Sequence, residues 1–297
     1  MSYRLKSGGG VRRRIRRVAR SQIDKALEAS RMLSDGGGEE IHDLRKAIKK
    51  TRAVLRLLRG SMRPKERRVQ DGRLGRIARR LAAPRDALVG LQTLEKLESE
   101  LPPSARALDR RLRRQLDAER SSVVARQRIE RDLRAARREL KRLPRRVARW
   151  KIEQGGWQAV HDGLIHDYRR VQQRLSAARA DASDENLHGL RRAIMSHAHQ
   201  IRLLAPHAPA RTSPRVEALD RITGELGDDR DLARLRSAVL AHPAASGMPQ
   251  RGRLLQAIEE RREHLDRAWF ERAGRLFADR PSEFARRMHR DWRRSSR

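Results

Sequence analysis

The octapeptide IHDLRKAI at residues 41–48 recurs as LHGLRRAI at residues 187–194. His, Leu, Arg, Ala and Ile coincide at one fixed offset, and the match continues without a gap to the tripeptide RLL at 56–58 and 202–204. Internal self-similarity of this kind indicates that a structural unit has been duplicated along the chain. We therefore predict that the two halves of the chain are copies of one unit.

A second match follows each copy, with LAAPRD at 81–86 and LGDDRD at 226–231. Around these segments the apolar residues recur at helical spacing, and clusters of Gly and Pro mark the ends of the helices. No segment shows the alternating pattern of a strand, so we predict an all-α protein. Its expected helices span residues 11–33, 39–58, 67–100 with a break at Pro84, 105–143 closed by Pro144, 163–179, 185–204, 214–240 and 251–277.

The same boundaries predict how the chain is divided. Gln154-Gly155-Gly156 is interpreted as a hinge between the halves. The expected parts are a flexible lead-in at 1–10, a first helical repeat at 11–150, a second at 151–280 and a basic C-terminal tail at 281–297.

The charge of the chain limits its partners. It carries 72 Lys plus Arg against 38 Asp plus Glu, a formal net charge of +34. Such a charge repels itself and favours binding to a dense anion, which leaves nucleic acid, an anionic membrane surface and polyphosphate as candidates. An aromatic content of 3% argues against stacking on single-stranded bases.

Other features of the composition exclude whole classes of protein. The chain has no cysteine, which excludes disulfides and thiolate metal sites. No apolar run reaches membrane-spanning length, so no membrane insertion is expected. The basic N-terminus lacks the apolar segment of a secretory signal, and a cytoplasmic location is expected.

A helical wheel separates the charged and apolar residues of each copy of the repeat. In the first copy one face carries His42, Arg45, Lys49, Arg52 and Arg56, with Lys46 and Lys50 at its shoulder; Leu44, Ile48, Leu55 and Leu58 lie opposite. In the second copy the polar face carries His188, Arg191, Arg192, His199 and Arg202; Leu190, Ile194, Ile201 and Leu204 face the core, and His197 falls on the apolar side.

A run of charges is usually only a solvated face of a helix. Solvated helices, however, interleave acidic residues at i, i+4 to relieve repulsion, and this face carries almost none between His42 and Arg59. The face also repeats with a His at the same place. We therefore interpret the two basic helices as a binding surface, whereas a structural role for His42 and His188 is left equally open.

The duplicated pattern His-x-x-Arg-Lys/Arg, which continues in the first copy as Lys-Lys-x-Arg, resembles the CHAD family of conserved-histidine α-helical domains. The Arg85-Asp86 and Arg230-Asp231 elements fit the same family. The resemblance implies two four-helix bundles related by a pseudo-twofold axis, with a basic groove between them that binds inorganic polyphosphate. It also implies an association with polyphosphate granules.

The second copy departs from this pattern. Met195, Ser196 and Ala198 stand where the first copy has Lys49, Lys50 and Arg52, so we expect a lopsided groove with most contacts on the first helix. The expected polyphosphate-binding residues are His42, Arg45, Lys46, Lys49, Lys50, Arg52, Arg56, Arg79, Arg80, Arg85, His188, Arg191, Arg192, His199, Arg202 and Arg230.

Motifs of catalysis are missing from the sequence. It contains no phosphate-binding loop ending in Lys-Ser/Thr, no His-Glu-x-x-His and no Gly-x-Ser-x-Gly. We expect a non-enzymatic binding protein without a cofactor, in which Asp86 and Asp231 orient neighbouring arginines. The alternatives are a nucleic-acid-binding helical protein, although no helix-turn-helix or RNA-binding motif is present, and a scaffold whose basic surface docks acidic proteins.

Overall fold

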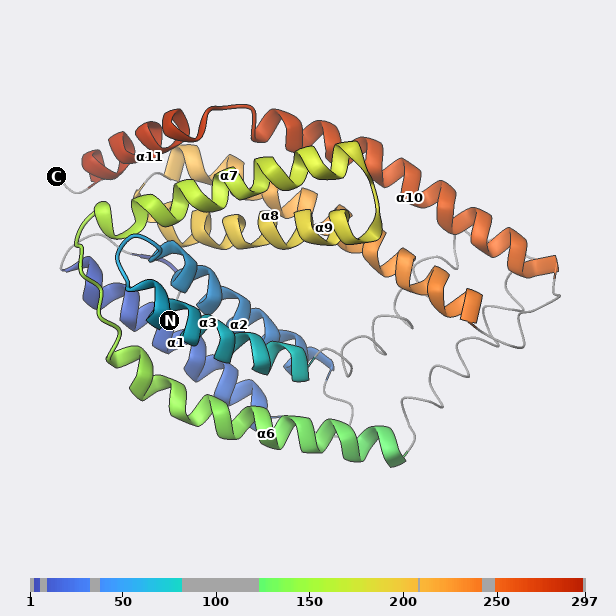
Figure 1. Ribbon diagram of the computed structural model, residues 1–297, viewed down its shortest axis with the longest axis horizontal. Coiled ribbons are helices and arrows are strands. Elements are labelled where there is room, and N and C mark those ends of the chain that lie inside the picture. Colours follow the sequence, from blue (N-terminus) through green and yellow to red (C-terminus); the bar gives the residue numbers. More distant parts are fainter. Residues whose placement is uncertain are drawn as a thin grey trace.

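The computed structural model describes residues 3–5, 10–32, 38–81, 123–207, 209–241 and 249–295. Every regular element in these ranges is a helix, which confirms the all-α prediction (Figure 1). Arg85, Asp86 and the first part of the helix expected at 105–143, up to residue 122, lie outside the described residues.

The described residues of the first half form a four-helix bundle. Its helices are α1 (Val11–Arg31), α2 (Gly38–Leu57), α3 (Pro64–Arg80) and α6 (Val123–Ala148). Both α1 and α3 pack against α2 and α6, so the four helices close into a ring of contacts. Bundles of this kind bury the apolar stripe of each helix against two neighbours.

The second half repeats this arrangement with α7 (Gln158–Ala180), α8 (Asp184–Leu204), α9 (Pro209–Ala241) and α10 (Pro249–Leu276). A single 3-10 turn, Ala205–His207, joins α8 to α9. Contacts run from α7 to α8, from α8 to α9, from α9 to α10 and back to α7. The two bundles agree with the predicted architecture, whereas a symmetry axis that relates them stays a prediction.

Sequence signals account for several helix ends. Glu39 and Glu40 in the first turn of α2 and Arg56 in its last turn complement the helix dipole, and Pro64 is the first residue of α3. Two predicted ends are wrong. Pro144 and Pro214 lie inside α6 and α9, where the helix continues past the lost backbone hydrogen bond.

The predicted hinge is a packed connection. Trp150 and Trp157, which flank it, are both buried in a hydrophobic core that runs through both bundles. The backbone N–H of Glu153 donates to the Ser61 carbonyl at 2.8 Å, and the Arg16 guanidinium donates twice to the Trp150 carbonyl at 2.9 and 2.7 Å. These bonds fix the connection between the halves.

Both ends of the chain pack onto the bundles. Tyr3 and Leu5 of the expected flexible lead-in are buried, and the Leu5 N–H donates to the Leu203 carbonyl at 2.8 Å. The expected basic tail is a helix, α11 (Pro281–Ser295), which packs against α7. Its apolar residues Phe284, Met288 and Trp292 are spaced by four and buried, so its basic residues occupy the other face.

The halves meet where α2 contacts α7 and α8. Gly163 of α7 lies at this contact, where a Cβ would be 2.0 Å from the Leu57 carbonyl oxygen of α2. Only glycine lets the two backbones come this near. The contact fixes the C-terminal end of α2 against the second bundle.

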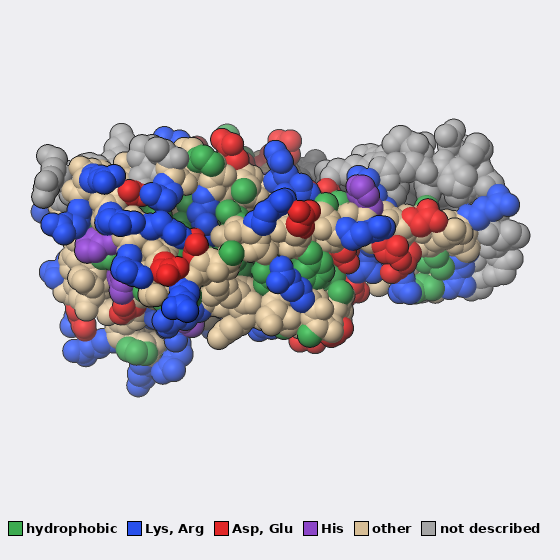
Figure 2. All heavy atoms as spheres, turned by 90° about the horizontal axis from the view of Figure 1, so that it is seen from above, with side chains coloured by type: hydrophobic (Ala, Val, Ile, Leu, Met, Phe, Trp, Pro, Cys, Tyr) green, Lys and Arg blue, Asp and Glu red, His purple; other side chains and the backbone are tan. Residues whose placement is uncertain are grey.

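Basic side chains are spread widely over the surface. Figure 2 shows Lys and Arg over the face that includes α7, α10 and α11, with Asp and Glu between them. Charge alone therefore does not locate a binding site. Within the described ranges, none of the helices combines the length and the apolar composition needed to cross a membrane.

Candidate functional site

Helix α2 presents its two faces as the sequence predicts. Leu44, Ile48, Leu55 and Leu58 are fully buried, whereas His42, Lys46 and Lys49 are exposed. Thr51, on the core side, satisfies its hydroxyl by donating to the Ala47 carbonyl one turn earlier at 3.0 Å. The core contacts thereby hold the charged face of α2 toward solvent.

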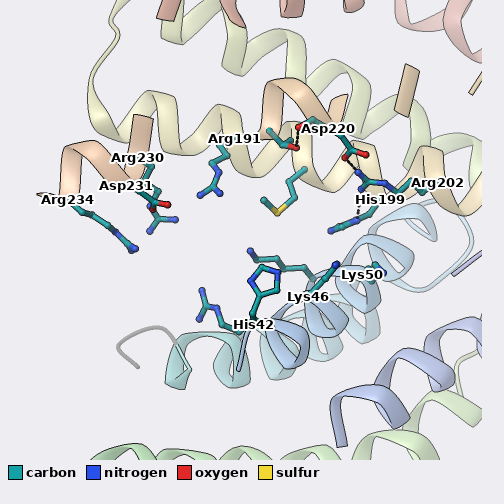
Figure 3. Close-up of a pocket in the computed structure, with 14 residues that line it drawn as sticks. His42, Lys46, Lys50, Arg191, His199, Arg202, Asp220, Arg230, Asp231 and Arg234 are labelled. Atoms are coloured by element: carbon teal, nitrogen blue, oxygen red, sulfur yellow. Dashed lines mark hydrogen bonds and ion pairs between the residues drawn. The ribbon is translucent and has the colours of Figure 1, made fainter. Parts of the chain in front are cut away.

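A cavity of about 530 Å³ opens between this face of α2 and the helices α8 and α9. Side chains from α2 point across it toward those from α8 and α9 (Figure 3). The lining residues are His42, Arg45, Lys46, Lys49 and Lys50 of α2, Arg191, Met195, His199 and Arg202 of α8, and Asp220, Thr223, Arg230, Asp231 and Arg234 of α9.

The lining is strongly cationic, since it holds eight Lys and Arg side chains against two Asp. One of the acids is already engaged, because Asp220 forms an ion pair with Arg202 (Figure 3). Burial lowers the pKa of Lys50, and the charges of Lys46, Lys25 and Arg202 lower it further. Cations held this close together stabilise an anion that is placed among them.

His199 lies nearly buried in the wall of the cavity. Burial, followed by the positive charges of Arg202 and Lys50, lowers its pKa to about 3, so the ring is neutral at pH 7. Arg202 Nη1 lies 3.3 Å from His199 Nδ1. Because an arginine can only donate, Nδ1 is the acceptor and the ring carries its proton on Nε2.

The N-terminal segment packs against Lys50, which lines the cavity. The Tyr3 hydroxyl donates to the Lys50 carbonyl at 3.1 Å, and Lys50 Nζ lies 5.1 Å from the centre of the Tyr3 ring. The same ring meets His199 edge-on at 6.2 Å. Burial raises the pKa of Tyr3, so its hydroxyl keeps its proton and remains a donor.

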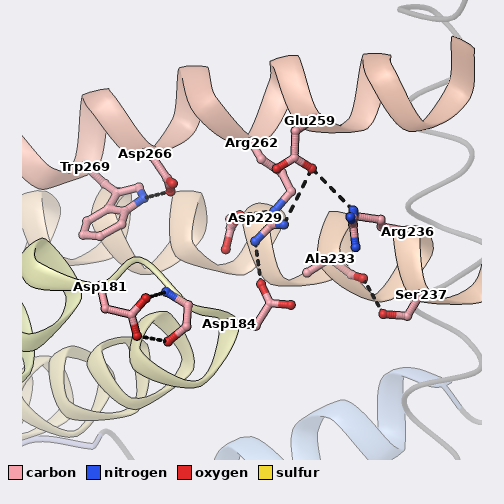
Figure 4. Close-up of polar contacts among 11 residues, drawn as sticks. Asp181, Asp184, Asp229, Ala233, Arg236, Ser237, Glu259, Arg262, Asp266 and Trp269 are labelled. Atoms are coloured by element: carbon pink, nitrogen blue, oxygen red, sulfur yellow. Dashed lines mark hydrogen bonds and ion pairs between the residues drawn. The ribbon is translucent and has the colours of Figure 1, made fainter. Parts of the chain in front are cut away.

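Ion pairs hold α9 in place as one wall of the cavity (Figure 4). Arg262 of α10 contacts Asp229 of α9 at 2.8 Å and Asp184, the first residue of α8, at 2.6 Å. Glu259 adds contacts of 3.6 Å to Arg236 and 3.9 Å to Arg262. Because the side chain of Arg262 is mostly buried, its ion pairs hold α8, α9 and α10 together.

Nine of the sixteen predicted binding residues line this cavity: His42, Arg45, Lys46, Lys49, Lys50, Arg191, His199, Arg202 and Arg230. Of the others, Arg52 forms two hydrogen bonds of 2.8 Å with Asp71 of α3, and Arg56 donates to Ser196 of α8 at 3.2 Å. Arg79 and Arg80 lie exposed on α3, where Arg80 pairs with Glu139 at 3.6 Å.

His188 and Arg192 also stand apart from the cavity lining. Burial and then the nearby charge of Arg230 lower the pKa of His188 to about 4, so its ring is neutral at pH 7. His188 Nδ1 is buried and has no hydrogen-bond partner. Neither observation decides between a structural and a binding role for this histidine. His197 is fully buried between Tyr168, Phe277 and Phe284, as its place on the wheel predicts.

Sequence reasoning left out Asp220, Thr223 and Arg234, which line the α9 wall. A signal for Arg234 was present, because it follows the predicted Arg230 by four residues and therefore shares its helix face. No comparable signal marks Asp220, whose place depends on how α9 packs beside α8.

Fold and cavity together define an all-α protein in which two four-helix bundles enclose a basic cavity. The model of the CHAD domain matches residues 17–241 of the chain, which therefore belongs to the CHAD family. Among curated proteins, none matches this chain.

The fold is also found in solved structures. The CHAD domain from the plant Ricinus communis superimposes with a TM-score of 0.58 at 17% identity, covering 93% of this chain and 94% of that one. PptA from Streptomyces chartreusis does so with a TM-score of 0.57 at 15% identity, covering 86% of this chain and 96% of that one. These similarities establish the arrangement of the helices across both bundles.

Proposed function

We propose that the protein binds inorganic polyphosphate, without catalysis, in the cavity between α2, α8 and α9. The observation that carries this proposal is the cavity lining, in which eight Lys and Arg side chains from three helices converge with only two acids. Polyphosphate is a flexible chain of anionic groups. Arginine can hold two of its oxygens at once, and lysine adds a mobile point charge.

The chemistry of the lining favours polyphosphate over nucleic acid. Among the described residues that line the cavity there is no Phe, Tyr or Trp. Proteins that hold single-stranded nucleic acid combine a basic groove with aromatic side chains on which the bases stack. A ligand made only of phosphates needs no such platform. Membership of the CHAD family supports the same ligand.

The proposal is tested by titrating long-chain polyphosphate, RNA and DNA, matched in total charge, against the protein at several salt concentrations. Polyphosphate should bind most tightly, and its log affinity should fall with log salt by about 0.7 for each phosphate contact. A flat salt dependence, or an equal affinity for the three polymers, would contradict a dedicated polyphosphate site.

Charge-reversal variants show whether the cavity is the site. Lys46→Glu with Lys49→Glu places two acids in the lining, whereas Arg286→Glu with Arg290→Glu makes the same change of charge on the exposed face of α11. Only the first pair should abolish tight binding. Equal losses in both pairs would mean that polyphosphate adheres to the basic surface as a whole.

The proposal extends to the cell, where the protein would associate with polyphosphate granules in the cytoplasm. A fluorescent fusion should lie on the granules, and the Lys46→Glu, Lys49→Glu variant should be spread through the cell. Granule binding that survives in this variant would show that another surface recruits the protein.

A further inference from the structure

A second group of cations gathers beyond the cavity, where the C-terminal part of α2 meets α3, α7 and α8. We call it the distal cluster. It consists of Arg52, Arg56, Arg59, Arg67, Arg170, Arg174 and Arg192. None of these residues lines the cavity described above. The two carboxylates among them are Asp71 and Asp167.

Both carboxylates are already engaged, Asp71 by an arginine of the cluster itself. Asp71 accepts two hydrogen bonds of 2.8 Å from Arg52. Asp167 is buried, and its Oδ2 accepts hydrogen bonds from Ser196 at 2.6 Å and from Gln200 at 2.9 Å. Asp167 Oδ1 lies 3.9 Å from Arg170 Nε, so the ion pair between these two residues is weak. The cluster therefore carries an excess of positive charge.

The arginines of the cluster lie close enough to repel one another. Burial, and then the charge of Arg170, lowers the pKa of Arg56 to about 10. Burial also lowers the pKa of Arg192, and the charges of Arg52, Arg170 and Arg174 lower it further. Repulsion between like charges destabilises the folded protein, and an anion that binds among them relieves this repulsion.

Part of the cluster is accessible to a ligand. Arg174 and Arg192 are exposed, and Arg170 is half-buried one turn before Arg174 on the same face of α7. A Cβ built on Gly189 would lie 3.3 Å from the Arg174 guanidinium, so this side chain rests on the backbone of α8. Helix α8 thus contributes residues both to the cavity and to the distal cluster.

The cavity and the distal cluster are linked along α2. Lys49 lines the cavity, Arg52 follows it by three residues and Arg56 by seven, so the three lie on one side of the helix. At 1.5 Å per residue, about 10 Å of helix separates Lys49 from Arg56. A flexible polyanion that fills the cavity therefore has to extend only about this far to meet the distal cluster.

We infer that the distal cluster is a second anion subsite, which holds a further segment of the same polyphosphate chain and makes the protein selective for long chains. This inference rests on the proposed function. A segment that is already tethered in the cavity meets the distal cluster at a high effective concentration, so binding of the two segments is cooperative. A chain too short to span both clusters gains nothing from the second.

The test compares tripolyphosphate with long-chain polyphosphate on three proteins. These are the wild type, the variant Arg170→Gln with Arg174→Gln, and the control Arg286→Gln with Arg290→Gln, which removes the same charge from α11. We expect the α7 variant to bind tripolyphosphate as the wild type does and to lose about tenfold or more in affinity for long chains. The control should keep both affinities.

Each other outcome is decisive. Undiminished long-chain binding by the α7 variant would overturn the inference, and so would equal losses for both ligands, because the arginines would then act only through general charge. A wild type that binds neither ligand would instead refute the proposed function. If the double variant is less stable than the wild type, Arg174→Gln alone repeats the test, since this side chain is exposed.

Discussion

Helices α2 and α8 carry the same sequence motif but contribute different numbers of cationic side chains to the cavity. Helix α2 contributes four cations, of which Lys46 and Lys49 are exposed. Helix α8 contributes two cations, and it buries Ser196, His197, His199 and Gln200, which are polar residues of its central turns. Arg230 and Arg234 of α9 add the cations that α8 lacks. A repeated motif thus preserves the position of a helix, whereas the charge of a site can be redistributed among its neighbours.

The largest expected effect concerns the place where α2 meets the second bundle. Gly163→Ala would put a Cβ 2.0 Å from the Leu57 carbonyl oxygen, and backbone cannot yield as a flexible side chain does. The variant should lose about 3 kcal/mol or more of the free energy of unfolding. Chemical denaturation measures this loss.

Gly72→Ala is the matched control, because a Cβ on this helical residue of α3 meets nothing within 4 Å. Helix propensity predicts that it stabilises the protein by up to about 1 kcal/mol. If both variants were equally stable, α2 and α7 would not be in the close contact described, and α2 would not be anchored at this end.

The next largest effect is a loss of polyphosphate affinity, which compares the two copies of the motif directly. Lys46→Gln with Lys49→Gln removes two cations from α2, and Arg191→Gln with Arg202→Gln removes both that α8 contributes. We expect polyphosphate affinity to fall in both, and more in the α2 variant, because Arg202 is already paired with Asp220. The loss should be about tenfold per phosphate contact, within the range of charged hydrogen bonds.

Isothermal titration at constant salt checks this order. A larger loss from the α8 pair would show that the second copy dominates and that the expected lopsided groove is wrong. The Arg286→Gln, Arg290→Gln variant serves as the reference for an equal change in net charge.

The wheel alone predicted which residues of α2 face solvent, because burial of Leu44 and Ile48 fixes the rotation of the helix. It could not separate Lys49, which lines the cavity, from Arg52, which pairs with Asp71. The two residues share a face, and the difference lies in the neighbouring helix. Only the packing of α3 decides it.

Similar limits explain the other differences. The C-terminal segment was expected to be a basic tail, yet Phe284, Met288 and Trp292 suffice to bury one side of α11. Pro144 was expected to close α6, but Leu143 and Val147 on either side of it are buried and keep the helix packed. Tertiary burial outweighed the local signal in both places.

A third prediction uses His199, which gives α8 a titratable group at the position where α2 has Ala53. Burial and the charges of Arg202, Lys50, Lys49 and Lys46 lower the pKa of His199 to about 3. Below about pH 6.5 the imidazole of His199 is protonated in the unfolded chain but stays neutral in the folded protein. This difference should lower the free energy of unfolding of the free protein by about 1.4 kcal/mol per pH unit as the pH drops from about 6.5 toward 3.

Bound polyphosphate places anions beside His199 and raises its pKa, so the stabilisation by the ligand should grow as the pH falls through the same window. Thermal unfolding with and without polyphosphate at several pH values measures both effects. His199→Gln should flatten part of each dependence, whereas His264→Gln, on the exposed face of α10, should not. Identical pH profiles for the wild type and His199→Gln would mean that this ring does not sense the ligand.

The smallest expected effect restores to the second copy a charge that the first one has. Met195 lines the cavity at the position that corresponds to Lys49, so Met195→Lys gives α8 the cation that α2 carries there. The new ammonium enters a lining that is already cationic, which offsets part of its attraction for the ligand. We expect polyphosphate affinity to rise by about threefold to tenfold and the salt dependence to steepen by about 0.7. The free protein should become slightly less stable, because Lys50 and Arg202 repel the added charge.

Met195→Leu, which keeps the apolar bulk, should leave the affinity unchanged. If Met195→Lys binds no better than Met195→Leu, the ligand does not reach the α8 wall, and its contacts are confined to α2 and α9.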